Sequence, residues 1–480
     1  KVEEAYGQQE VERDGEPDGW HRIHFSYDKN NHLNVVKDDF GAKMRYDYDC
    51  LGNVTLEERV IADGVHSVIH YAYNKNGWLV QRTEEIQGNG PVQAAVTRYA
   101  YDANGNLTKI TTPKGSEIHR SYDADDRLTE ERVLDRKNGI DRRVQYVYDA
   151  AGNVLKRTLL GADGECLESS TRYDLKDRAT HRTNPAGGVT RYLYDRNDRL
   201  RKEIRPYGYE PESDDGAGVS YTYDSRGNRL RTTNALGEVV QELSYNLRNQ
   251  PVIQKDTFGN RTELSYELDG KIKDVRRSGN GNRNHQRTLQ QYEYNARGQI
   301  TGVVDGNRNP ISYDVDSWGR ITGIGFVDGV KEGYEYTPAG QISRTIDGNG
   351  NSVQYRYNSL GKVSERTDQL GFTETFRYDE EGNLSLHIDR DGRQLQRACN
   401  VFGQPVYEKA SDAEGKHTNI STWHYDSLGR VTRAVCDGKS YEYIYDAHGN
   451  LKEKRSNGKR LVSYTHDRAG QITEIRDPAG

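Results

Sequence analysis

The 480-residue sequence is poor in apolar side chains, and this scarcity excludes several common classes of protein. Only 33% of the residues are hydrophobic, and methionine, tryptophan and phenylalanine occur 1, 4 and 7 times. No apolar run reaches the roughly 18 residues of a membrane-spanning helix, so the sequence predicts no such helix. The chain begins at Lys1 and its only methionine is Met44, so we expect an internal piece of a longer polypeptide.

Cysteine is scarce as well, and charge of neither sign is in excess. The four cysteines (Cys50, Cys166, Cys399 and Cys436) are far apart, form no CxxC motif and indicate no disulfide framework. The chain has 68 basic and 74 acidic residues, which gives a formal net charge of −6. This balance provides no electrostatic footprint for nucleic acid and no basic patch for an anionic membrane.

Tyrosine and glycine are abundant instead, with 34 and 49 copies. A low apolar share combined with 30% charged residues is typical of disordered chains. Aromatic side chains at this density, however, favour β-strands. We therefore expect an ordered, all-β chain.

A short repeated motif accounts for many of these tyrosines and glycines. Residues 99–107 show it in the form YAYDANGNL, and we count 20 copies at spacings of 20 to 29 residues. Because no long stretch lies outside the pattern, we interpret residues 1–480 as one continuous array of about 20 repeats. The repeat positions that we single out as structural, in five of the copies, are Tyr48, Asp49, Gly52, Tyr101, Asp102, Gly105, Tyr148, Asp149, Gly152, Tyr357, Asn358, Gly361, Tyr445, Asp446 and Gly449.

The spacing within the motif predicts a tight turn between two strands. Tyr99 and Tyr101 are two residues apart, so they point to the same face of a strand. Asp102 follows at a position where a short acceptor side chain caps a type I turn. Gly105 falls where a three-residue hairpin loop needs left-handed backbone. That position is Gly in 15 copies and Asn or Asp in the other five, which are the residues that tolerate a positive φ.

Each repeat is expected to contribute two strands and two turns, giving about 40 short antiparallel strands joined by hairpins. At about 4.8 Å per strand the ribbon is roughly 190 Å long, and it must coil because sheets twist. The apolar share is too small for a solid core, so we expect the ribbon to spiral into a hollow shell or part of one. The tyrosine rings are expected to pack on neighbouring strands while their hydroxyls stay hydrated. Three long intervals between motifs are expected to protrude as loops: Arg82 to Thr97, Pro206 to Val219 and Arg276 to Leu289.

The motif resembles that of the YD-repeat, or Rhs-repeat, family, whose signature is Tyr-x-Tyr-Asp-x-x-Gly-x followed by Leu, Val or Ile. The resemblance covers the chain from about Phe25 to Gly470. The family includes bacterial Rhs and wall-associated polymorphic toxins, shell subunits of insecticidal toxin complexes, and teneurins. The resemblance implies a hollow β-shell that holds a toxic C-terminal domain in the bacterial members. We interpret Asp477 and Pro478 as a repeat turn, so neither the family's self-cleaving core nor a toxin domain is assigned here.

No pattern in the sequence points to catalysis, a cofactor or a metal. The adjacent carboxylates Asp214 and Asp215 lie in an insertion. Residues 347–351 resemble the start of a calcium loop, but Ser352 and Asn358 stand where such a loop has its glycine and its terminal glutamate. We therefore expect a protein that is not an enzyme and that a bacterium exports, secreted or on its surface. The first hypothesis is a structural shell segment that encloses and protects a toxin or other cargo polypeptide of the same parent chain. The alternative is a cell-surface adhesin whose tyrosines bind a glycan or a receptor.

Overall fold

The structure is a computed structural model that describes residues 2–6, 21–88, 90–161, 164–279 and 286–478. Its elements are 43 β-strands. The strands of the first half are β1 (Val2–Tyr6), β2 (His21–Tyr27), β3 (Leu33–Asp38), β4 (Lys43–Tyr48), β5 (Val54–Ala62), β6 (Val65–Tyr73), β7 (Leu79–Gly88), β8 (Gly90–Tyr101), β9 (Leu107–Thr111), β10 (Glu117–Tyr122), β11 (Leu128–Asp135), β12 (Ile140–Tyr148), β13 (Val154–Leu160), β14 (Cys166–Tyr173), β15 (Ala179–Thr183), β16 (Val189–Tyr194), β17 (Leu200–Ile204), β18 (Tyr209–Glu210), β19 (Asp215–Gly216), β20 (Val219–Tyr223), β21 (Arg229–Thr233) and β22 (Val239–Tyr245). The strands of the second half are β23 (Pro251–Asp256), β24 (Arg261–Tyr266), β25 (Ile272–Ser278), β26 (Arg287–Tyr294), β27 (Ile300–Asp305), β28 (Pro310–Val315), β29 (Ile321–Gly325), β30 (Lys331–Tyr336), β31 (Ile342–Ile346), β32 (Ser352–Tyr357), β33 (Val363–Thr367), β34 (Thr373–Tyr378), β35 (Leu384–Ile388), β36 (Gln394–Cys399), β37 (Pro405–Ser411), β38 (His417–Tyr425), β39 (Val431–Cys436), β40 (Lys439–Tyr445), β41 (Leu451–Ser456), β42 (Lys459–His466) and β43 (Ile472–Arg476).

One continuous antiparallel sheet contains 41 of these strands, and each pairs with its neighbours in sequence. The exception is the small hairpin β18–β19, which forms a two-stranded sheet of its own while β17 pairs directly with β20. A chain of hairpins is what tyrosine-rich strands separated by tight turns dictate. The prediction of an all-β ribbon of about 40 short antiparallel strands is therefore confirmed.

The sheet is one layer thick, so few of its side chains are fully buried. Ile140 and Ile204 are 2% and 0% exposed, but most described strand residues are only half-buried. A wall with two solvated faces needs far less apolar surface than a close-packed core. This arrangement explains how a chain with 33% hydrophobic residues forms so much regular structure.

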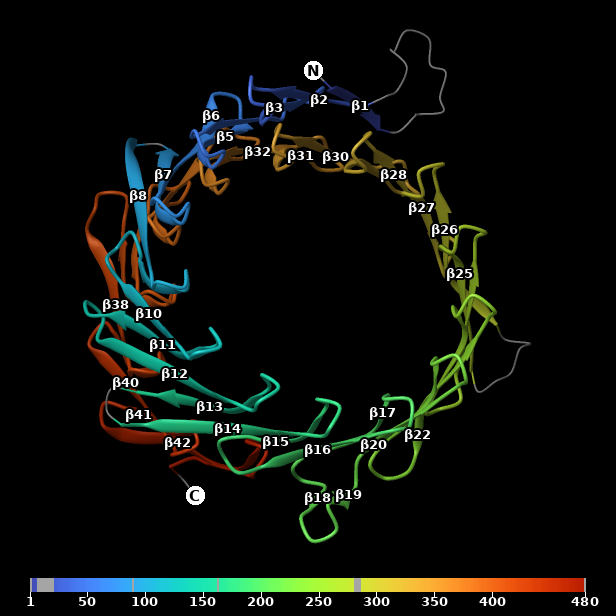
Figure 1. Cartoon of the computed structure of the whole chain (residues 1–480). Helices are drawn as coiled ribbons and strands as arrows, with labels where there is room; N and C mark the ends of the chain where they lie inside the picture. Colours follow the sequence, from blue (N-terminus) through green and yellow to red (C-terminus); the bar gives the residue numbers. More distant parts are fainter. Residues whose placement is uncertain (1, 7–20, 89, 162–163, 280–285, 479–480) are drawn as a thin grey trace.

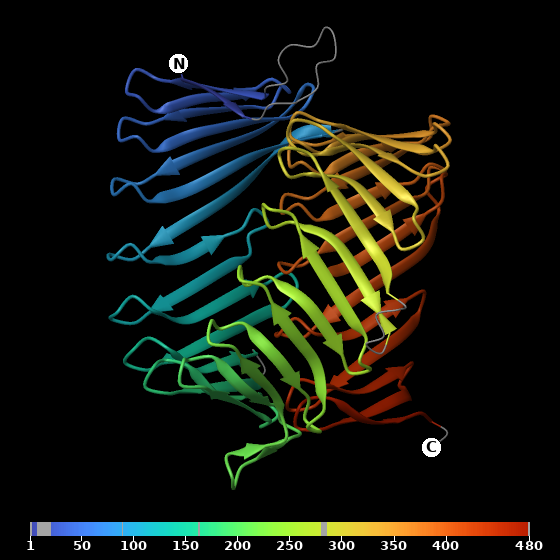
Figure 2. The same ribbon diagram turned by 90° about the vertical axis from the view of Figure 1, so that its right-hand side faces the viewer.

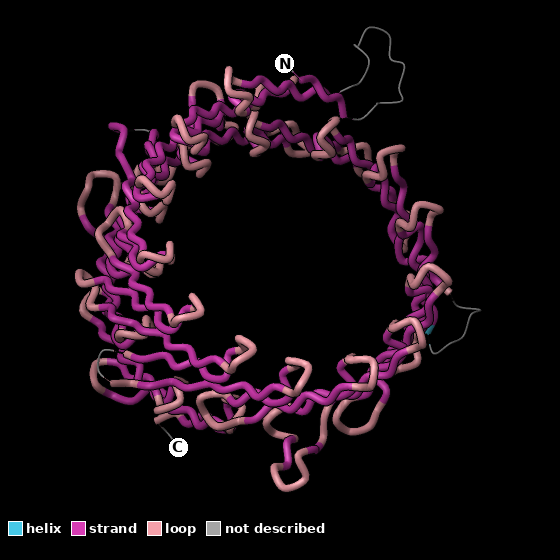
Figure 3. The backbone as a smooth tube through the Cα atoms, viewed as in Figure 1, coloured by secondary structure: helices cyan, strands magenta, loops and turns pink. Residues whose placement is uncertain are grey.

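The ribbon winds around an open centre (Figure 1). The strands up to about β27 form a first winding, and the strands from β28 onward continue beside it as a second winding (Figure 2). Viewed along the axis, β30–β32 lie behind β2–β5, and β38–β42 lie close to β10–β14 (Figure 1). No described segment crosses the centre of the ring (Figure 3). The predicted spiral around a hollow space is thus the observed architecture.

The contacts between the windings give the size of the coil. Hydrogen bonds from one winding to the other join residues 263 to 285 positions apart, so one winding holds about 25 strands. At about 4.8 Å per strand the circumference is roughly 120 Å and the diameter of the backbone ring roughly 40 Å. Side chains extend about 5 Å from a sheet face, so roughly 30 Å stays open across the middle.

One of the three intervals that were expected to protrude as loops is different in the structure, and the prediction was wrong there. Residues 82–97 lengthen β7 and β8, whose pairing runs from Gln81 and Arg98 to Gly88 and Gly90 with a register shift between Ile86 and Gly88. Ile86 and Ala95 are buried on these strands, so apolar contacts favour extending the ladder over a free loop. The insertion at residues 206–219 does project outward from the ring as the β18–β19 hairpin (Figure 1). In the third interval, residues 280–285 lie outside the described residues.

Candidate functional site: repeat turns and the seam between windings

The YD turn comprises the five residues that follow the second aromatic of each motif, and its first side chain organises it. In the copy that starts at Asp149, Oδ1 accepts hydrogen bonds from the backbone N–H groups of Ala151 and Asn153, both at 2.9 Å. The side-chain amide of Asn153 donates to Oδ2 at 3.0 Å. The Asp149 N–H donates to the carbonyl of Asn153, and its own carbonyl accepts from the N–H of Gly152. One carboxylate therefore satisfies most of the polar groups of the loop.

The fourth residue of the YD turn is left-handed in all 20 copies, as the sequence predicts. The five glycines singled out from the sequence all have φ between 70° and 93°: Gly52, Gly105, Gly152, Gly361 and Gly449. The five copies without glycine have φ between 59° and 66° at Asn31, Asp126, Asp177, Asp198 and Asn249. The pattern of Gly, Asn and Asp is therefore a requirement of the backbone.

Hydrogen bonding keeps the turn carboxylates ionised. The side-chain amide of Asn153, followed by its backbone N–H, lowers the pKa of Asp149. The side-chain hydrogen bonds from Arg178 lower the pKa of Asp174 to about 2. These carboxylates are acceptors for turn N–H groups and arginines, an arrangement that suits a structural role better than proton transfer.

The second tyrosine of the motif links neighbouring repeats through its hydroxyl. In 16 copies the hydroxyl donates to the backbone carbonyl of the residue that opens the second strand of the preceding repeat, at 2.5–3.1 Å. Tyr148, for example, reaches the carbonyl of Leu128, beyond the point where the β11–β12 ladder ends at Glu130 and Gln145. The expectation that these hydroxyls stay hydrated was wrong. Neighbouring hairpins separate at the turn end, and the hydroxyl satisfies a carbonyl that the ladder leaves unpaired.

Removing one of these hydroxyls is expected to weaken the coil locally. Tyr357→Phe deletes the 2.6 Å bond to the carbonyl of Ile342, and we expect a loss of about 1 kcal/mol in unfolding free energy. Tyr355 is a matched control on the same strand, because its hydroxyl has no hydrogen bond to any described residue. Tyr355→Phe should change stability by much less. Equal effects of the two substitutions in urea unfolding would contradict this role of the hydroxyl.

A cation at the fifth turn position packs on the tyrosine of the next repeat. The guanidinium of Arg178 lies 4.5 Å from the ring centre of Tyr194, while its Nε donates to Asp174 at 2.8 Å. This contact was not foreseen from the sequence, although its signal is visible there as a recurrent arginine. The arginines that make it are Arg127, Arg178, Arg199, Arg320 and Arg430.

The two windings meet along a seam, where return turns of the first winding contact YD turns of the second. Return turns are the turns that connect one repeat to the next. The Ser359 hydroxyl donates to the carbonyl of Glu85 at 2.9 Å and accepts from the N–H of Gln87 at 2.7 Å. The Asp135 carboxylate accepts from the N–H of Val401 at 2.9 Å. Ser359 and Asp135 are almost completely buried, so the seam excludes water at these points.

Ion pairs and a histidine contact add to the seam. Lys114 pairs with Asp379, and the guanidinium of Arg430 pairs with Glu165. Burial lowers the pKa of the Lys114 ammonium, but the hydrogen bond and charge of Asp379 and the charge of Glu381 outweigh burial, so the pKa is raised. Further along, a ring nitrogen of His448 contacts the carbonyl of Pro185 at 2.9 Å. These three contacts join turns of the two windings. Within the described residues, no backbone ladder connects the windings.

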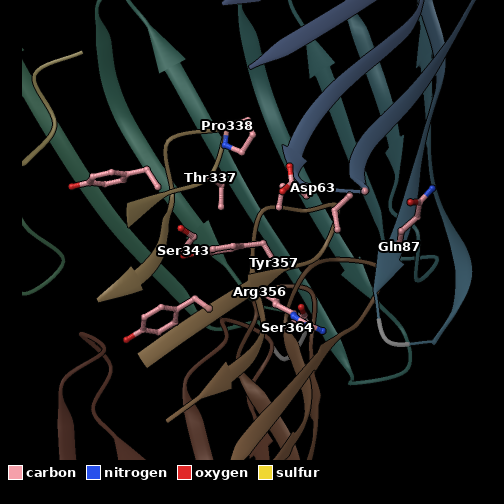
Figure 4. Close-up of a pocket in the computed structure, with 13 residues that line it drawn as sticks. Asp63, Gln87, Thr337, Pro338, Ser343, Arg356, Tyr357 and Ser364 are labelled. Atoms are coloured by element: carbon pink, nitrogen blue, oxygen red, sulfur yellow. The ribbon is translucent and has the colours of Figure 1, made fainter. Parts of the chain in front are cut away.

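A pocket of about 620 Å³ lies beside the seam (Figure 4). Its lining combines Asp63 and Gln87 of the first winding with Thr337, Arg356 and Tyr357 of the second. Among the described lining residues there is no cysteine or histidine and only one acid, Asp63. The pocket therefore presents no set of groups typical of a catalytic centre.

The other candidate groups make structural contacts. Asp214 contacts a ring nitrogen of His181 at 2.7 Å, accepts from the Tyr209 hydroxyl at 3.0 Å and pairs with Arg191 at 3.0 Å, which fastens the β18–β19 hairpin to β15 and β16. Asp347 accepts turn N–H groups, as in a YD turn. Within the described ranges, no three His, Cys, Asp or Glu side chains gather as a metal site requires. That part of the chain also contains no helix long and apolar enough to cross a bilayer.

A one-layer ribbon of hairpins, wound into an open coil and locked at most of its YD turns by Asp and Gly, is the architecture of a YD-repeat shell protein. The family described as teneurin YD-shell matches residues 16–234 and 242–398, and the chain belongs to this family. The family described as RHS repeat matches residues 445–480. The resemblance inferred from the motif is thereby confirmed.

Curated relatives of the chain are much longer proteins, and one of them is named as a toxin. The tRNA3(Ser)-specific nuclease WapA of Bacillus spizizenii is 30% identical over 223 residues, which is 42% of this chain and 9% of that protein. The toxin protein Tse5 of Pseudomonas aeruginosa is 26% identical over 281 residues, which is 57% of this chain and 19% of that protein. The chain thus spans less than a fifth of either relative's length.

Solved structures share the fold at low sequence identity. The Tc holotoxin pore of Photorhabdus luminescens superposes with a TM-score of 0.60 at 14% identity, covering 96% of this chain and 26% of that one. The TcdB2–TccC3 complex gives a TM-score of 0.59 at 13% identity, covering 95% and 31%. Nearly the whole chain therefore has the fold of part of a toxin-complex shell.

Proposed function

We propose that the chain is a wall segment of a container that encloses a polypeptide cargo, namely a toxic domain of its own parent protein, before delivery. The observation that carries this proposal is the single-layered coil with an open centre of roughly 30 Å (Figure 1). Such a space accommodates an unfolded or partly folded chain. Membership of the YD-shell family and a relative named as a toxin support the container over the adhesin considered from the sequence.

We also propose that residues 1–480 act as one array within a longer protein, which is supported by their covering only 9% to 19% of their relatives. The chain itself is not an enzyme, and the nuclease named in one relative is a property of that whole protein. The parent protein is exported by a bacterium, since its curated relatives include bacterial toxins.

Protection of the cargo in the parent protein tests the proposal. We expect the cargo to resist an added protease and to be cleaved at least tenfold faster when the seam is opened by Asp135→Lys with Glu165→Lys, because both place positive charge against the second winding. Glu210→Lys with Glu212→Lys is a control of equal charge on the outward hairpin. Equal cleavage in all three proteins would overturn the container.

A second measurement addresses catalysis. The purified 480-residue chain should cleave neither tRNA nor DNA above the level of buffer alone. Cleavage that persists after rigorous purification would show that the shell segment itself is an enzyme.

A further inference from the structure

The pocket beside the seam is lined by polar groups that the fold itself does not use (Figure 4). On the first winding, the Asp63 carboxylate and the Gln87 side-chain amide make no hydrogen bond or ion pair with any described residue. On the second winding, the same holds for the hydroxyls of Ser343, Ser364 and Tyr355. Ser364 is only 5% exposed, and a hydroxyl buried to this extent normally has a partner. The pocket therefore offers several polar groups to a ligand.

The two serines depart from a hydrogen bond that recurs in the repeat. Ser343 and Ser364 both occupy the second position of the strand that follows a YD turn. A threonine at this position donates its hydroxyl to the carbonyl eight residues earlier, as Thr322 does to Asp314 at 3.2 Å. Six threonines make this bond: Thr108, Thr129, Thr180, Thr322, Thr432 and Thr473. Neither serine makes it, so both hydroxyls remain available in the pocket.

The pocket contains one unpaired charge, and this charge is negative. It belongs to Asp63, since the other charged lining residue, Arg356, directs its guanidinium to Glu365 at 3.2 Å and has a side chain that is 79% exposed. At the adjoining YD turn, the almost fully buried Thr337 stands where most copies have Asp. The carboxylate of Asp63 therefore determines the charge that a ligand meets.

Two tyrosine rings of the lining lack the cation that covers such rings elsewhere in the coil. Tyr336 is covered by the guanidinium of Arg320, 4.6 Å from its ring centre. The corresponding turn residue before Tyr357 is the neutral Gln341, and neither Tyr355 nor Tyr357 has a cation–π contact with a described residue. The face of an aromatic ring attracts cations. These two rings can therefore receive a cation from outside the chain.

The combination of groups excludes the other classes of ligand. An anion would be repelled by the carboxylate, and a neutral molecule would displace its water without neutralising its charge. An apolar molecule would also leave the buried hydroxyls without partners. A metal ion needs more strong ligands than one carboxylate, and among the described residues no three His, Cys, Asp or Glu side chains come together.

We propose that the pocket binds a small organic ammonium ion such as a polyamine. Its N–H groups donate to the Asp63 carboxylate and to the hydroxyls of Ser343 and Ser364, and its charged chain lies against Tyr355 and Tyr357. The pocket volume of about 620 Å³ is within the usual range for small-molecule sites. Because the lining comes from both windings, the bound cation bridges them and stabilises the coil. The site is independent of what the coil encloses.

Isothermal titration calorimetry of the purified chain with spermidine tests the proposal. We expect 1:1 binding with a dissociation constant of about 1 mM or lower, and no binding of triethylene glycol, an uncharged chain of similar length. Asp63→Asn should weaken the binding of spermidine at least tenfold, because it removes the charge and leaves an Asn-Gly pair that suits the turn. Glu212→Gln removes the same charge from the exposed outward hairpin and should leave binding unchanged.

Variants of the second winding separate the hydroxyl from the ring. Ser364→Ala should weaken binding several-fold, whereas Ser385→Ala, at the same position of the next repeat and outside the lining, should not. Tyr355→Leu, which removes the ring, should weaken binding more than Tyr355→Phe, which keeps it. A chain that does not bind spermidine, or an Asp63→Asn variant that binds it as well as the parent chain does, would overturn the proposal. Protease protection of the cargo is measured independently, so failure here leaves the container intact.

Discussion

The stability of the coil is expected to fall steeply when the pH is lowered through about 4 to about 2. The pKa of the first carboxylate is lowered in ten turns, in each of which a hydrogen bond from the turn is the leading cause: Asp28, Asp49, Asp123, Asp149, Asp174, Asp195, Asp224, Asp256, Asp305 and Asp347. Glu117, bonded first by Lys109, has its pKa lowered to about 2 as well.

The fall of stability with falling pH follows from proton linkage. A carboxyl whose pKa is lower in the folded coil than in the unfolded chain stabilises the fold fully above its unfolded value, near 3.8 for Asp. That contribution is lost as the pH falls through the folded value, about 2 for Asp174. Each carboxylate contributes little, because solvent screens its interactions. The loss of stability at low pH becomes large because the same carboxylate recurs along the ribbon. Thermal midpoints measured by circular dichroism across this pH range provide the test.

A matched variant isolates the turn carboxylates from the other acids. Asparagine already opens the turns at Asn74, Asn246 and Asn358, where its Oδ1 accepts the same two N–H groups. Replacing Asp49, Asp149, Asp224, Asp256 and Asp347 together by Asn should preserve the fold near neutral pH and flatten the acid dependence. An unchanged acid profile in this variant would exclude the turn carboxylates as its source.

Gly152→Val is expected to lower the unfolding free energy by about 1–2 kcal/mol, because a β-branched residue is strained at positive φ. Gly152 has a φ of 91°, and a Cβ built there meets nothing within 4 Å. The loss would thus come from the backbone alone. At Gly361, by contrast, a Cβ would also meet the side-chain amide of Gln341 at 3.0 Å.

Gly152→Asn is the control for this substitution, since Asn31 and Asn249 adopt the same conformation in their own copies. It should cost only a few tenths of a kcal/mol. Chemical unfolding of the two variants beside the parent chain decides the matter. A Val variant as stable as the Asn variant would mean that left-handed backbone is not what selects glycine here.

The parts of the fold that were predictable are those that a short stretch of sequence determines. The motif contains its own turn, so Asp149 and Gly152 indicate the hairpin, and twenty hairpins in series indicate the ribbon. The scarcity of apolar residues indicates that the ribbon encloses space instead of a core. None of these inferences needs information from a distant part of the chain.

The seam could not be predicted, because its partners are more than 260 residues apart and belong to no shared pattern. Ser359 and Asp135 are ordinary turn residues in sequence, and only the pitch of the coil brings them against Gln87 and Val401. The tyrosine hydroxyls were misjudged for a related reason. Their acceptor carbonyls become available only where adjacent hairpins separate, which is a feature of the assembled sheet.

The pairing of each strand with its sequence neighbours sets the order in which the molecule folds. A hairpin closes in microseconds, and contacts between residues close in sequence form before contacts that close long loops. The ribbon therefore grows hairpin by hairpin from whichever end emerges first, with each new repeat using the last as its template. The contacts across some 263 to 285 residues form last, when the second winding reaches the first. A chain that leaves a ribosome or a secretion channel gradually can thus complete its wall before any domain that follows the array reaches the centre.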